Sequence, residues 1–157
     1  MKHALLFAGT LLLAGVAQAQ QPAAAPQPTT LPAAAAALPR TAAPAGAELY
    51  FIAPADGAMV DKEFTVRFGL KGMGVAPAGI TLAKTGHHHL LIDVAELPPM
   101  NQPLPMDDKH KHFGGGQTEA TITLSPGKHT LQLILGDALH IPFDPPILSP
   151  KITVTVK

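Results

Sequence analysis

Apolar and polar residues alternate one by one along several short segments in the C-terminal two thirds of the chain. The alternation is clearest over 64–70, 120–124, 131–135 and 152–156. A period of two places every second side chain on one face of an extended strand, which is typical of a sheet with one buried face. Turns that contain glycine or proline separate these segments, and no segment shows the period of an amphipathic helix.

The number and length of these segments indicate the fold class. Six or seven short strands over about 110 residues are typical of an antiparallel β-sandwich of immunoglobulin-like type, with a small barrel as the alternative. In both folds the strands form the core and the loops carry the functional residues. We expect strands at 48–52, 64–70, 87–94, 120–124, 131–135 and 152–156, with a short seventh strand at 80–82.

The first 19 residues have the composition of a signal peptide. Lys2 supplies a basic start, an apolar run follows over 4–16, and Ala17-Gln18-Ala19 supplies a cleavage site of small residues. The apolar run is shorter than the roughly 20 residues that a membrane span needs. No cysteine follows the site for a lipid anchor. We therefore expect export to the periplasm, or secretion, from a Gram-negative bacterium, with no membrane span in the mature chain.

Residues 20–46 consist almost entirely of alanine, proline, glutamine and threonine. Proline removes backbone donors and favours extended conformations, and the segment has almost no large apolar side chains to bury. This composition predicts a disordered linker. The folded domain is then expected at 47–157, a length that supports one modest core.

Charge and cysteine content narrow the possible partners. After removal of the signal peptide, ten Lys and Arg face eleven Asp and Glu, because Lys2 is lost from the eleven basic residues. This balance and the lack of a basic stripe argue against a nucleic-acid partner. There is no cysteine, so neither a disulfide nor a zinc site with sulfur ligands can form.

The histidines are the main functional signal. All seven that follow the signal peptide fall within 87–140, and imidazole is the commonest protein ligand for late first-row metals. In a strand, His87 and His89 share one face, and His110 and His112 do so if that segment is extended. His88 points the opposite way, toward the expected core, unless a one-residue slip exchanges the two faces.

An up-and-down strand order would gather five of these side chains at one pole of the sandwich. We predict a copper or zinc site there, because ligands rich in nitrogen suit both ions. His129 would begin a strand at the opposite pole, which favours a structural role. Met73, Met100 and Met106 are more typical of packing than of ligation. The predicted ligands are His87, His89, His112 and His140, with His110 as an alternate.

Two other functions stay open at this point. The chain could be a structural or interaction module without a metal, in which the histidines fasten the long loop and the linker projects the domain toward an envelope protein. An enzyme is weakly supported, because Ser125 and Ser149 both precede proline and no nucleophile motif surrounds them. A metal-activated water, with Glu119 as a base, would be the remaining route to catalysis.

Four motifs resemble the bacterial domain of unknown function 4399 family. They are GHHHLLID at 86–93, HFGGGQTE at 112–119, PGKHTLQL at 126–133, and Gly136-Asp137 with His140 and Pro142. The resemblance covers roughly 49–157 and implies an exported bacterial domain, with no established activity. The family pattern often has a second histidine after the one that matches His140. Phe143 stands at that position here, which implies weaker or different metal binding if that histidine is a ligand.

Overall fold

The computed structural model describes residues 38–157. These residues form nine strands and no helix, so the prediction of an all-β domain is confirmed. The predicted signal peptide and most of the predicted linker lie outside the described residues. Within the described part, no helix is long and apolar enough to cross a membrane.

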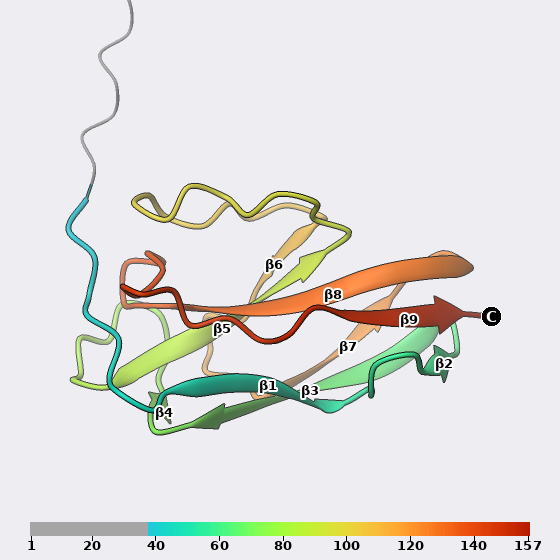
Figure 1. Ribbon diagram of the computed structural model, residues 1–157, viewed down its shortest axis with the longest axis horizontal. Helices are drawn as coiled ribbons and strands as arrows, with labels where there is room; N and C mark the ends of the chain where they lie inside the picture. The colour runs from blue at the N-terminus through green and yellow to red at the C-terminus, as the bar shows by residue number, and fades with distance from the viewer. Residues whose placement is uncertain (1–37) are drawn as a thin grey trace, which may run out of the picture. The chain divides into compact units, whose positions relative to one another are not determined.

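The strands form two sheets (Figure 1). The smaller sheet has the order β1-β3-β7, with β1 at Glu48–Ala53, β3 at Glu63–Lys71 and β7 at Glu119–Thr123. The larger, six-stranded sheet has the order β2-β9-β8-β5-β4, and β6 also pairs with β5. Its strands are β2 (Met59–Val60), β4 (Gly74–Val75), β5 (Thr85–Ile92), β6 (His110–His112), β8 (Gly127–Gly136) and β9 (Ile152–Val156).

Six of these strands correspond to strands expected from the sequence, namely β1, β3, β5, β7, β8 and β9. The strand expected at 80–82 is wrong: this segment is irregular, and Ile80 and Leu82 are exposed. The strands that the sequence did not indicate are β2, β4 and β6, which have two, two and three residues. Such segments are too short to show a period. The two sheets are consistent with a β-sandwich, and the immunoglobulin-like type stays a prediction.

The six-stranded sheet is apolar on both of its faces. Leu90, Ile92 and Leu133 point inward and pack against Val66 and Phe68 of the smaller sheet. This arrangement confirms that the core face of β5 carries His88, Leu90 and Ile92. The outward face carries a second hydrophobic cluster in which Leu91, Leu104 and Ile134 are buried.

The loop between β5 and β6 covers this outward face. In Figure 1 it lies beyond β5 and β8, on the side away from β1 and β3. Leu104 of this loop is buried against the sheet, and Met100 packs beside it. The long loop is therefore a third layer, and side chains on the outward face of β5 lie beneath it.

The last nine residues of the predicted linker, 38–46, lie in the described part and contact the domain. The backbones of 41–43 pair with Asp144 through two hydrogen bonds of 2.8 Å, Ala43 N–H to Asp144 O and Asp144 N–H to Thr41 O. The guanidinium of Arg40 forms an ion pair with Asp144 at 2.9 Å and donates to the carbonyls of Pro142 and Phe143. Residues 40–43 are therefore held against the loop at 142–144 by backbone and side-chain contacts.

Candidate metal centre

Strand β5 places two imidazoles side by side beneath the long loop. His87 and His89 are two residues apart, so both point to the outward face, and both are fully buried. Their Nε2 atoms lie 3.0 Å apart. The sequence pattern predicted this pairing, since an i, i+2 spacing on a strand aligns two side chains.

Strand β6 adds a third imidazole. It pairs antiparallel to β5, with His112 directly opposite His89. One nitrogen from each of His87, His89 and His112 lies within 4.8 Å of the others. Two nitrogens bound to one tetrahedral zinc at 2.0–2.1 Å are roughly 3.3 Å apart. Small side-chain rotations would therefore bring all three onto a single ion.

The loop after β8 adds the fourth imidazole. The ring centroid of His140 lies 4.7 Å from that of His112 and 4.9 Å from that of His87. The separation from His89 is larger, at 5.9 Å. We call His87, His89, His112 and His140 the histidine cluster. It lies near the end of the sheet where β5 begins and β8 ends, on the outward face.

Two glycines make room for these rings. A β-carbon at Gly114 would overlap the ring of His112, and a β-carbon at Gly136 would lie 3.0 Å from Nε2 of His89. Glycine is the one residue that permits so close an approach of backbone and imidazole. The run of glycines at 114–116 thus begins with a residue that shapes the cluster.

The cluster favours neutral imidazoles, which is the form that binds metal. Burial is the largest cause that lowers the pKa of His87 to about 4; the neighbouring His140 and His112 act in the same direction, and Asp137 opposes them. Burial, followed by the neighbouring histidines, lowers the pKa of His89 to about 2. The pKa of His112 is also lowered, first by burial and then by His140. Protonation of these three rings is therefore strongly disfavoured.

Several ring nitrogens in the cluster lack a hydrogen-bond partner among residues 38–157. They are Nδ1 of His87, Nδ1 of His89 and Nε2 of His112. Buried polar atoms in folded proteins are nearly always satisfied, so each such atom calls for an explanation. The loop-fastening hypothesis requires hydrogen bonds from these rings to loop carbonyls. Within the described range, none is found for these three rings.

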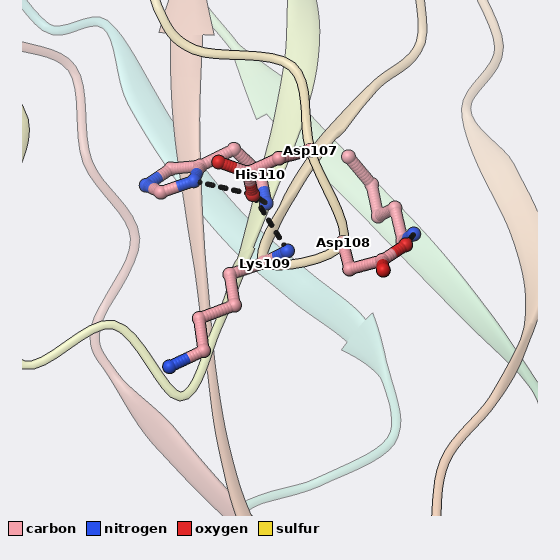
Figure 2. Close-up of polar contacts among 5 residues, drawn as sticks. Asp107, Asp108, Lys109 and His110 are labelled. Atoms are coloured by element: carbon pink, nitrogen blue, oxygen red, sulfur yellow. Dashed lines mark hydrogen bonds and ion pairs between the residues drawn. The ribbon is translucent and has the colours of Figure 1, made fainter.

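The structure places His110 apart from the histidine cluster. Its Nδ1 lies 2.8 Å from Oδ1 of Asp107, which also accepts the backbone N–H groups of Lys109 and His110. Figure 2 shows the His110 ring turned toward Asp107. His110, the predicted alternate ligand, is thus engaged by Asp107 in a local turn, although it shares strand β6 with His112.

The other two histidines lie elsewhere. His88 is fully buried on the core face, where its ring centroid lies 5.1 Å from that of Phe68. The Nδ1 of His129 lies 2.7 Å from the carboxylate of Asp93, and its Nε2 lies 2.9 Å from Ser125 O. Both contacts link segments of the fold, in agreement with the structural role expected for His129.

Among the histidine, cysteine, aspartate and glutamate side chains of the described residues, the converging ligand atoms are imidazole nitrogens. Met73 packs against the core, Met100 packs in the second hydrophobic cluster, and Met106 is exposed. The carboxylate of Asp137 is close to the cluster, yet its oxygens accept hydrogen bonds from Thr41, Leu139 and Ile141. The donor set is therefore nitrogen alone.

The sequence reasoning missed Arg40 among the residues that support the cluster. Gly114, Gly136 and Asp137 lie in the motifs quoted above for the family resemblance. Arg40 is the only charged residue in the otherwise neutral stretch 20–46. A lone charge in such a segment is the signal that could have indicated a specific contact.

A comparison with protein families finds one match in this chain. The family model described as "Domain of unknown function (DUF4399)" matches residues 66–157, which include every member of the histidine cluster. No curated protein and no solved structure matches the chain.

Proposed function

The chain belongs to the family of the domain of unknown function DUF4399, and from this premise we propose that it binds a divalent transition-metal ion through the histidine cluster. His87, His89 and His112 form the core of the site. His140 is the fourth ligand. The family supplies no activity, so the proposal depends on the geometry of the four rings.

One observation supports the proposal above the others. Ring nitrogens of two buried histidines and one half-buried histidine, from β5 and β6, converge within 4.8 Å, and several ring nitrogens of these histidines find no partner within 38–157. Burying such groups without compensation costs about 1–3 kcal/mol each. A bound cation would compensate this cost for each ring nitrogen that turns its lone pair toward the ion. Packing alone gives no reason to gather three polar rings in one place.

The donor set favours copper or zinc. A site of imidazoles suits Cu(II) and Zn(II), and copper lies highest in the divalent affinity order. Cu(I) prefers thioether and thiolate ligands. The converging group in the described part of the chain is made of imidazoles, and Met73 and Met100 pack in the hydrophobic clusters. We therefore expect Cu(II) to bind more tightly than Zn(II) when each is offered alone.

The proposed place of action is outside the cytoplasm. The signal peptide expected at 1–19 and the proline-rich segment that follows support export and a tethered domain. In that compartment a cysteine-free site of nitrogen ligands has an advantage, because it cannot be lost through oxidation of thiolates. Metal storage or buffering in the periplasm is the role that fits these features.

Isothermal titration of the chelator-treated protein, without a histidine tag, tests the proposal. With Cu(II) and Zn(II) as separate titrants, we expect about one ion per chain and submicromolar affinity. The variants His87→Ala and His112→Ala should each weaken binding by at least about 100-fold, since a lost ligand matters more than a lost outer partner. His110→Ala is the matched control and should leave the affinity unchanged.

Two results would overturn the proposal. The first is wild-type affinity no tighter than that of scattered surface histidines. The second is equal loss in His110→Ala and His112→Ala, which would place the metal away from the cluster. The first result would favour the alternative, a module of the cell envelope that recognises a protein partner without a metal.

A further inference from the structure

His140 has a backbone conformation that needs support from its surroundings. Its φ angle is +67°, in the left-handed region that is uncommon for residues other than glycine. Such a conformation persists where neighbouring contacts over-determine it, often at functional sites. The question is which residues hold this loop, since they also hold the fourth ring of the cluster.

Asp137 supplies the first set of contacts. Its Oδ1 accepts the backbone N–H groups of Leu139 and Ile141 at 2.9 and 3.0 Å, one on each side of His140. Its backbone carbonyl accepts the N–H of His140, and its own N–H donates to the carbonyl of Ile141, both at 2.9 Å. One residue therefore closes the whole turn around His140.

The N-terminal segment supplies the second set. The hydroxyl of Thr41 donates to Oδ2 of Asp137 at 2.8 Å, which occupies the remaining carboxylate oxygen. Arg40 donates to the carbonyls of Pro142 and Phe143 and pairs with Asp144. Residues about 100 positions apart in sequence are thus joined across the loop that carries His140.

We propose that Asp137 is a positioning residue of the metal centre, and that Thr41 fixes its carboxylate so that His140 is delivered as the fourth ligand. This inference rests on the proposed metal-binding function. Its consequence is a choice between two kinds of site. With His140 in place, four protein ligands close the coordination shell, as in structural zinc sites; without it, three imidazoles leave a position open to water.

The test uses Cu(II) as the probe, with affinity measured by titration and the number of nitrogen ligands measured by electron paramagnetic resonance. Asp137→Ala should weaken binding by ~10-fold, the lower end for an outer partner of a ligand, and should remove one coordinated nitrogen. Asp137→Asn should restore most of the affinity, because an amide oxygen still accepts both N–H groups. Thr41→Val should give a smaller loss, of about threefold.

The controls separate positioning from general stability. Thr41→Ser keeps the hydroxyl and should bind as the wild type does. Thr65→Val removes another threonine hydroxyl, whose oxygen lies 3.2 Å from that of Thr121 on the smaller sheet, and should change neither affinity nor spectrum. Thermal unfolding of each apoprotein shows whether a variant has kept its fold.

A double-mutant cycle decides the route of the effect. In a His140→Ala background, Asp137→Ala should change Cu(II) affinity by less than about twofold. An undiminished loss in that background would overturn the inference, and so would wild-type affinity and spectrum in Asp137→Ala. These outcomes differ from failure of the proposed function. In that case the wild-type protein would bind no Cu(II), and His87→Ala would cause no loss of affinity.

Discussion

The two faces of β5 place histidines of equal burial in different surroundings. His88 points inward and packs on Phe68 in the apolar core. His87 and His89 point outward, are equally inaccessible, and meet His112 and His140 beneath the loops. Of these three adjacent histidines, His88 is alone in the core, and His87 and His89 supply two of the four rings of the histidine cluster.

This difference shows that burial alone does not make a binding site. Burial lowers the pKa of His88 to about 4, the same value as for His87, where burial is also the largest cause. What distinguishes the outward face is convergence. β6 brings a nitrogen of His112 within 4.8 Å of one from each of His87 and His89, and the loop after β8 brings the ring of His140 beside those of His87 and His112. A strand can therefore carry a core position and a ligand position at neighbouring residues.

The largest expected effect comes from exchanging one histidine on each face for leucine. His89→Leu should abolish metal binding, with a loss of at least about 100-fold, because a ligand near the centre of the cluster is removed. His88→Leu should leave the stoichiometry and affinity unchanged, since its ring points into the core. Titration of both variants with Cu(II) measures the contrast. Equal losses in the two variants would mean that the faces do not differ in function.

The second effect concerns the space that glycine leaves for a ligand. Gly114→Ala should displace the ring of His112 and weaken metal binding by ~10-fold, comparable to loss of an outer partner. Gly74→Ala is the matched control, because its new β-carbon would lie 3.4 Å from the Thr85 side chain, an ordinary contact. Titration and thermal unfolding of the apoproteins separate the two contributions. Unchanged affinity in Gly114→Ala would show that His112 does not need its present position.

The strands were predictable from sequence because most of them have one buried face. Alternation located four of the six longer strands, β3, β7, β8 and β9, and apolar runs located β1 and β5. The common side of His88, Leu90 and Ile92 identified the core face of β5. Alternation could not locate β2, β4 or β6, which have too few residues for a period. It also misled at 80–82, where Ile80 and Leu82 alternate with threonine in an exposed loop.

The candidate site was only partly predictable, for a physical reason. The spacing of His87 and His89 is local, so strand geometry fixes their common face. Their approach to His112 and His140 depends on how two long loops return to the sheet, which no local pattern encodes. His110 is two residues from His112 on the same strand, but its ring contacts the carboxylate of Asp107 in a local turn. The contact of Thr41 with Asp137 spans 96 residues and left no trace in composition.

The third effect tests the inward face through stability. His88→Leu should raise the free energy of unfolding by about 1 kcal/mol at pH 7, because it removes two ring nitrogens that lack a hydrogen bond of normal geometry within 38–157. The gain should grow on acidification. In the wild type, the lowered pKa of His88 means that stability is lost as the pH falls from about 6.5 toward about 4.

Urea unfolding of the apoproteins at pH 7, 6 and 5 measures this gain. The comparison needs chelator throughout, since a bound metal would stabilise the native state by mass action. A loss of about 1–3 kcal/mol in His88→Leu would instead assign the imidazole a hydrogen bond that stabilises the core. His88 would then stabilise the fold through a polar contact, and the contrast between the inward and outward faces of β5 would be smaller.

The smallest effect lies at the ion pair of His129 and Asp93, remote from both faces of β5. The hydrogen bond to Asp93 raises the pKa of His129, so the folded state holds this proton more tightly than the unfolded state does. The pair therefore stabilises the protein fully below pH 6.5, and this contribution disappears as the pH rises through the raised pKa. His129→Gln should cost less than about 1 kcal/mol at pH 6, because Asp93 is partly exposed, and nothing at pH 9. Metal affinity should not change at either pH, and a fall in affinity would extend the site beyond the four rings.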